Sequence, residues 1–237
     1  MNPLLLSLAI ASALAAAAPS GQKTGPLKPA IPTFHPAGFT SVVDNPYFPL
    51  RLGTVLVYET RAGKTTEVDT VTVTRETRTV LGVTAVVVRD RTYSGGKLVE
   101  ESFDWYAQDR KGSVWSLGED TKDLNDGQVV STAGSWEAGK DSASAGIVMP
   151  AIPQVGMEYR QGYRRGKVED QAVVLNLDAK VLVMNMTFTA CVETEEWSAL
   201  GREAREQKVY APGLGLVSRH TVTGMGEWTK LVKVIAP

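Results

Sequence analysis

One pattern of strands and turns occurs twice in this sequence, about one hundred positions apart. In each copy a glycine opens the pattern, a Gly-Lys turn follows, and a Tyr-Ala pair precedes a glycine turn. The ordered matches are Gly53 with Gly156, Gly63-Lys64 with Gly166-Lys167, residues 65–74 with 168–177, 103–107 with 207–211, and 112–115 with 213–217. This order predicts duplication of a meander of about five strands.

The strands of the first copy are indicated by β-branched residues, by alternation and by turns such as Gly95-Gly96. Two such meanders would each leave an apolar face open, and pairing them hides both faces. The sequence therefore predicts an all-β fold, either an antiparallel barrel or paired half-barrels. The expected segments of this single domain, residues 46–237, are repeat 1 over 53–117, a connecting loop over 118–153, repeat 2 over 154–218 and a C-terminal strand over 219–237.

The N-terminal region predicts export. Residues 4–18 are apolar or small apart from Ser7 and Ser12, and they end in an alanine run that suits signal-peptide cleavage. The stretch is shorter than the roughly twenty residues that a membrane helix needs. We therefore expect a signal peptide over residues 1–18, a proline-rich linker over 19–45, a secreted or periplasmic protein, and no membrane span.

Composition narrows the possible chemistry. A formal net charge of −1 with interspersed signs argues against nucleic acid as a partner. Cys191 is the only cysteine, which rules out an internal disulfide and favours a buried, inert thiol. The only histidines, His35 and His220, do not build a histidine-rich metal site or a Ser-His-Asp triad. No cofactor is expected.

The unrepeated segment 118–153 is where function is expected, because long glycine-rich connections are usually functional or disordered. The alternative is a crossover that is merely packed by its aromatic residues. Adjacent strand residues point to opposite faces, so only one of Trp105 and Tyr106 can line the interior. The candidate ligand-binding residues are Trp105, Tyr106, Trp115, Glu119, Trp136, Glu137, Met149 and Tyr210.

Carboxylates crowd the region 104–141 and allow two further interpretations. Glu119 and Glu137 are the first pair to consider as general acid and base, as in glycoside hydrolysis. Asp120, Asp123 and Asp126 are weak candidates for Ca²⁺, but they lack the order of an EF-hand loop. A solvated acidic turn is the default, so no metal site is predicted.

Short motifs carry two family resemblances. The DWYAQD motif at residues 104–109 and the GSWEAG motif at 134–139 resemble an uncharacterised group of exported bacterial proteins. Residues 48–50, together with Gly53, Tyr58 and residues 210–217, resemble half-barrel envelope proteins of the LolA and LppX type. The second resemblance implies a concave apolar sheet that could hold lipid, and no catalytic residues transfer with it.

Three functional hypotheses follow. The first is a secreted or periplasmic β-barrel binding module for a small apolar or lipid-like ligand, with residues 118–153 as its lid or rim. The second is an acid/base enzyme of the hydrolase or isomerase type that uses carboxylates of the 104–141 region. The third is an envelope structural or interaction protein without a cavity. A buried carboxyl pair with no basic neighbour would favour the second, and a filled interior the third.

Overall fold

A computed structural model describes residues 29–201, 204–223 and 226–237. The predicted fold class is confirmed, because these residues form a 16-stranded sheet in which the named strand pairs are antiparallel. The helical structure in the described ranges is a single short 3-10 turn, η1 (Pro36–Gly38). The expected signal peptide and the first part of the expected linker lie outside the described residues.

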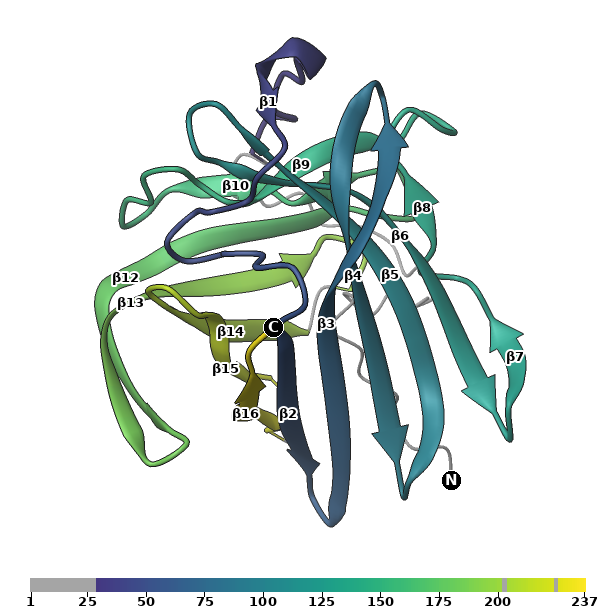
Figure 1. Ribbon diagram of the computed structural model, residues 1–237, viewed down its shortest axis with the longest axis vertical. Helices are drawn as coiled ribbons and strands as arrows, with labels where there is room; N and C mark the ends of the chain where they lie inside the picture. Colours follow the sequence, from purple (N-terminus) through teal and green to yellow (C-terminus); the bar gives the residue numbers. More distant parts are fainter. Residues whose placement is uncertain (1–28, 202–203, 224–225) are drawn as a thin grey trace, which may run out of the picture.

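Two meanders of five strands make up most of the sheet (Figure 1). The first contains β2 (Val55–Ala62), β3 (Thr65–Val80), β4 (Val83–Ser94), β5 (Lys97–Asp109) and β6 (Val114–Asn125). The second contains β10 (Glu158–Arg160), β12 (Asp170–Val183), β13 (Met186–Ser198), β14 (Arg205–Ala211) and β15 (Gly215–Thr221). Strand β16 (Trp228–Ile235) pairs with both β15 and β2 and so joins the two meanders.

A seam on the other side nearly closes the sheet into a barrel. Strand β9 (Ser144–Met149) pairs with β6 and also with β11 (Gly162–Tyr163). Gln161 alone separates β11 from β10, which pairs with β12. The backbones meet so closely here that a Cβ added to Gly146 would lie 2.4 Å from the carbonyl carbon of Gln161.

The two meanders begin in the same way. The backbone N–H of Gly53 donates to the Val73 carbonyl at 2.7 Å, and that of Gly156 donates to the Val174 carbonyl at 2.8 Å. The sequence alignment matches Val71 with Val174, whereas these hydrogen bonds match Val73 with Val174. The two halves therefore differ by two residues in strand register. Strand order in both halves is the one that the sequence pattern predicts, while their origin by duplication stays a prediction.

The expectation of a connecting loop over residues 118–153 is wrong for most of its length. Strand β6 continues to Asn125, and β7 (Gln128–Ser131), β8 (Trp136–Glu137) and β9 follow, all joined to the sheet. Glycine and small residues in this segment indicated a loop, but here they let strands approach closely. Gly118 has φ +137°, and a Cβ there would lie 2.4 Å from the Trp136 carbonyl oxygen.

The described part of the proline-rich segment is packed on the barrel, although a linker was expected up to residue 45. Strand β1 (Phe39–Thr40) pairs with β5. The rings of Phe34 and Phe39 lie 5.6 Å and 5.8 Å from the Trp115 ring in edge-on geometry. Proline prevents helix and central strand, but it does not prevent aromatic side chains from docking on a sheet.

Apolar side chains form one cluster inside the barrel and another outside it. Along β4, Val86 and Val88 belong to the inner cluster, whereas Ala85 and Val87 belong to the outer cluster. Residues 136–145 and the proline-rich segment cover this outer face. Cys191 is fully buried in the inner cluster, in agreement with the expected inert thiol. Within the described ranges, no helix has the length and apolar character that crossing a membrane requires.

Candidate ligand-binding cavity

A cavity of about 240 Å³ lies inside the barrel. Its exposed lining residues gather at one end and mark the mouth: Arg51, Gly213, Val234, Ala236 and Pro237. Just inside the mouth the walls are apolar. They comprise Phe48, Leu50, Leu56, Leu214 and Leu216.

The inward-facing side chains change from apolar to acidic along the strands. On β4, Val88 is followed two positions later by Asp90, and on β3 the inward residues run from Val73 and Val71 to Asp69. Residues two apart on a strand share a face, so each change occurs within the barrel interior. The cavity therefore has an apolar outer part and an acidic inner part.

Two carboxyl groups of the inner part face each other across neighbouring strands. Asp104 on β5 is the direct partner of Glu119 on β6, and both line the cavity. Ser102 donates to Asp104 at 3.3 Å, while Thr121 and the Trp136 indole donate to Glu119 at 3.1 Å and 3.2 Å. Neighbouring side chains thus position both acids.

The environment of this pair favours the protonated forms. Burial raises the pKa of Asp104 to about 7, against the hydrogen bonds from Ser102 and Tyr106. Burial, together with the nearby Asp104 carboxyl, holds the pKa of Glu119 well above its usual range. No basic side chain forms an ion pair with either acid in the described part of the chain. This is the buried carboxyl pair that would favour an acid/base enzyme.

Asp90 and Gln161 line the cavity with side-chain oxygens that have no hydrogen-bond partner among the described residues. Asp90 is 4% exposed, and neither of its carboxyl oxygens has a hydrogen-bond partner within the described ranges. Burial raises the pKa of Asp90 well above its usual range, and the Asp69 and Asp104 carboxyls raise it further. The side-chain oxygen of Gln161, which is 5% exposed, also lacks a partner in the part of the chain that the structure describes.

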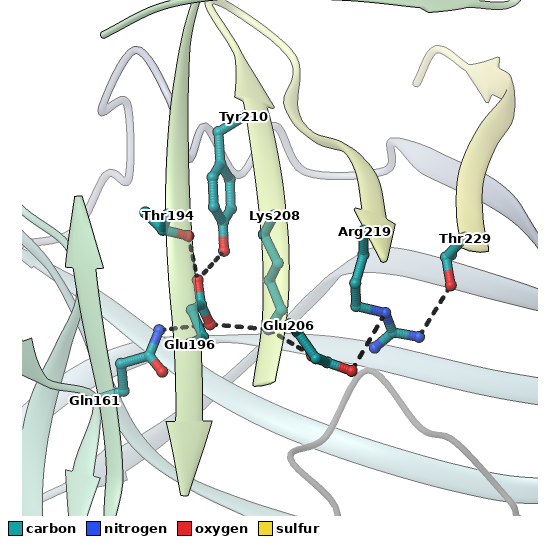
Figure 2. Close-up of polar contacts among 8 residues, drawn as sticks. All are labelled: Gln161, Thr194, Glu196, Glu206, Lys208, Tyr210, Arg219 and Thr229. Atoms are coloured by element: carbon teal, nitrogen blue, oxygen red, sulfur yellow. Dashed lines mark hydrogen bonds and ion pairs between the residues drawn. The ribbon is translucent and has the colours of Figure 1, made fainter. Parts of the chain in front are cut away.

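A charged network occupies the opposite wall (Figure 2). Glu196 accepts hydrogen bonds from Gln161 at 2.8 Å, Lys208 at 2.9 Å, Tyr210 at 2.8 Å and Thr194 at 2.9 Å. Burial would raise the pKa of Glu196, but the Lys208 ammonium and these donors hold it below its usual value. Glu196 is therefore an ionised carboxylate with four hydrogen-bond donors, whereas the Asp90 oxygens have none among the described residues.

The network continues away from the cavity to Arg219. Lys208 lies 3.6 Å from Glu206, whose carboxylate lies 3.8 Å from the Arg219 guanidinium (Figure 2). Arg219 also donates to Thr229 at 3.2 Å. Burial would lower the pKa of Arg219, but Glu206, Asp69 and Asp90 act in the other direction and raise it. The Arg219 guanidinium thus attracts the buried carboxyls of Asp69 and Asp90.

Asp170 at the start of β12 is the remaining cavity acid. It is 8% exposed and lies directly opposite Ser198 on β13. Burial raises its pKa to about 7, despite the hydrogen bond from Ser198 and the attraction of Lys208. Asp170 adds a carboxyl to the wall between the Glu196 network and Glu119.

The structure brings some of the predicted ligand-binding residues together and separates the others. Tyr106, Glu119, Trp136 and Tyr210 line the cavity. Trp105 and Trp115 lie in the outer cluster, as the opposite faces of Trp105 and Tyr106 require, and Met149 is buried in the inner cluster without lining the cavity.

Glu119 and Glu137 do not form a site. Trp136, not Glu137, is the residue opposite Glu119, so the next residue along β8 points to the other face. There Glu137 lies 2.6 Å from Arg78 and 3.0 Å from Lys140. The expected acid/base pair is therefore wrong, and Asp104 is the carboxyl that faces Glu119.

The three weak calcium candidates do not converge. Asp120 lies 3.3 Å from Lys122, and Asp126 lies 2.6 Å from Lys97. Among the described residues, no group of three or more His, Cys, Asp or Glu side chains could hold a metal ion, so Asp123 belongs to no such group either.

Sequence reasoning missed Asp90, Asp170, Glu196 and Lys208 as site residues, and it included Asp104 only among the carboxylates of the 104–141 region. A usable signal was present at Asp90, because it shares its alternating positions on β4 with Val86 and Val88. An acid in such a position is unusual unless it serves a buried polar site.

Comparisons with known proteins give distant structural similarities. No protein-family model matches the chain, and no curated protein matches it significantly. A candidate exported protein with a YmcC-like fold from Bacteroides fragilis is similar at a TM-score of 0.43 and 13% identity, over 80% of this chain and 99% of that one. A candidate lipoprotein from Parabacteroides distasonis is similar at a TM-score of 0.43 and 13% identity, over 80% of this chain and 98% of that one.

Proposed function

We propose that this protein is an exported β-barrel module that binds a small molecule with an apolar body. The observation that carries the proposal is the cavity of about 240 Å³, with apolar walls at its mouth and polar groups inside. Small-molecule sites combine mainly apolar walls with a few placed polar groups in this way. The open interior also argues against a structural protein without a cavity. Export rests on the apolar residues 4–18 and the alanine run that ends them.

Native mass spectrometry of protein purified from its own host tests the binding proposal. We expect the spectrum to show a retained small molecule. We also expect the purified protein to take up the apolar fluorescent probe N-phenyl-1-naphthylamine. Leu216→Trp should fill the mouth and abolish uptake, because Leu216 lines the cavity. Val129→Trp is the matched control, since Val129 is 53% exposed on β7 and does not line the cavity. A folded wild-type protein with no retained molecule and no probe uptake would contradict the proposal.

Export has its own measurement. N-terminal sequencing of periplasmic or extracellular material should find a mature end between about residues 16 and 21, where the small residues follow the apolar run. Intact Met1 in cytoplasmic protein would contradict export without affecting the binding proposal.

The Asp104–Glu119 pair supports a second candidate function, acid/base catalysis inside the barrel. Two opposed buried carboxyls with raised pKa values can act as proton donor and acceptor near neutral pH. A panel of chromogenic glycosides and esters tests it. Turnover that is lost in both Asp104→Asn and Glu119→Gln, with probe uptake retained, would support the enzyme, and wild-type protein without turnover on the panel would count against it.

A further inference from the structure

We infer that the ligand carries a protonated amine, which sits among Asp90, Asp104 and Glu119 while its apolar body points to the mouth. This inference rests on the proposed binding function and specifies the ligand class. The three acids lie on the adjacent strands β4, β5 and β6, and all line the same cavity.

The unmet hydrogen-bonding atoms of the cavity lining are oxygens. Both carboxyl oxygens of Asp90 and the side-chain oxygen of Gln161 are buried without a partner in residues 29–201, 204–223 and 226–237. A buried acceptor left unsatisfied costs about 1–3 kcal/mol, so a ligand that supplies donors there gains binding energy. A protonated primary amine offers three N–H donors and no acceptor, which complements such a wall.

The charge distribution points the same way. Five carboxyl side chains line the cavity, namely Asp90, Asp104, Glu119, Asp170 and Glu196, whereas its lining cations are Lys208 and Arg51. Lys208 is engaged by Glu196 at 2.9 Å, and Arg51 is exposed at the mouth. In the described ranges no ion pair reaches Asp90, Asp104, Glu119 or Asp170. Arg219 lies outside the cavity lining and is paired with Glu206, so a ligand cation would supply positive charge within the cavity itself.

The two ends of the cavity define the orientation of such a ligand. Phe48, Leu50 and Leu216 surround the outer part, where an alkyl or aromatic body is buried favourably. The carboxyls lie deeper, and a buried cation is tolerated only where it is paired with them. An apolar amine matches both parts, whereas an apolar acid would place a negative charge against the carboxyls.

Binding of a cation should release protons, because it favours the ionised forms of carboxyls that burial keeps protonated. The titratable and charged groups that face this region come from strands all around the barrel. They are Tyr58 on β2, Asp69 on β3, Asp90 on β4, Glu100, Asp104 and Tyr106 on β5, Glu119 on β6, Asp170 on β12, Glu196 on β13, Lys208 and Tyr210 on β14, and Arg219 on β15.

Titration calorimetry with octylamine, 1-octanol and octanoate at pH 7.5 tests the inference, since the three probes differ only in their head group. We expect octylamine to bind at least tenfold more tightly than octanol, and octanoate to bind most weakly. Asp90→Asn and Glu119→Gln should each weaken octylamine binding by tenfold or more, and should change octanol binding by a much smaller factor. Asp123→Asn, on β6 but outside the cavity lining, is the matched control.

A second measurement needs no variant. Octylamine titrations in phosphate and in Tris, which differ in ionisation enthalpy, should show proton release by the wild-type protein. Equal or tighter binding of octanol or octanoate, or no proton release, would overturn the amine assignment while leaving the binding proposal intact. If none of the three probes and no N-phenyl-1-naphthylamine binds, the proposed function itself fails.

Discussion

Asp104 on β5 lies directly opposite Glu119 on β6, and both side chains line the cavity. Residues directly opposite on antiparallel strands have Cβ atoms about 4.5–5.5 Å apart, so the two carboxyls influence each other's ionisation. The opposite wall presents the Glu196–Lys208 ion pair, which is already satisfied. The cavity therefore combines titratable acids on the first meander with a fixed charge pair on the second.

The first prediction concerns pH. Burial raises the pKa of Asp104 to about 7 in the folded protein, against an ordinary value near 3.9 in the unfolded chain. The folded state thus binds this proton more tightly, and the stability that it provides below about pH 4 is lost as pH rises to about 7. One pKa unit corresponds to about 1.4 kcal/mol. The unfolding free energy of Asp104→Asn, taken relative to that of wild type, should therefore rise by roughly 2–4 kcal/mol from pH 4 to pH 8.

Urea unfolding at pH 4, 6 and 8 measures this difference. Asp123→Asn, outside the cavity, should follow the wild-type curve. If Asp104→Asn loses as much stability on going from pH 4 to pH 8 as wild type does, Asp104 is not held protonated by its surroundings.

The second prediction concerns the buried ion pair. Lys208 is 6% exposed and donates to Glu196 at 2.9 Å. Lys208→Met leaves the Glu196 carboxylate buried without its cation, which should cost about 3–5 kcal/mol of unfolding free energy. The double variant Glu196→Gln/Lys208→Met removes both charges and should recover most of that loss. Chemical denaturation measures the unfolding free energy of both variants. A double variant that is no more stable than Lys208→Met would show that the loss does not come from an unpaired Glu196 charge.

The third prediction concerns the barrel seam. A Cβ at Gly146 would lie 2.4 Å from the Gln161 carbonyl carbon and 2.6 Å from the Arg160 carbonyl oxygen. Gly146→Ala should therefore separate β9 from the β10–β11 corner and cost about 2 kcal/mol or more, because the added methyl group overlaps backbone atoms. Gly38→Ala is the matched control, because a Cβ there would have no atom within 4 Å. Similar melting temperatures for the two variants would show that the seam is not tightly packed.

The fourth prediction concerns Trp136, which is 8% exposed. It lines the cavity beside Glu119, to which its indole N–H donates, and it also packs against residues of the outer cluster. Trp136→Ala should lower stability by about 3–5 kcal/mol, as loss of a large buried side chain does. Trp136→Phe keeps most of the packing but removes the donor to Glu119. It should therefore alter amine binding more than stability. If Trp136→Ala leaves the melting temperature unchanged, the packing role is wrong.

The alternation of residues along the chain predicted most strands of the first half. Thr and Val at alternating positions in β3, and glycine at the turns, are local signals that need no knowledge of the fold. The same alternation determined that Trp105 and Tyr106 occupy opposite faces. Each of these features depends on residues close together in sequence, and for that reason the sequence alone was enough.

Tertiary structure decided which face is the inside and which carboxyls meet there. Asp104 and Glu119 come together because β5 and β6 pair in one register, and a shift of one residue would turn either side chain outward. Gln161, between β10 and β11, meets Glu196 of β13 across β12, 35 residues away in sequence. The outer cluster exists because residues 136–145 fold back over β4 and β5. Register and closure are long-range properties, so the acidic cavity emerges only when the sheet curves back onto itself.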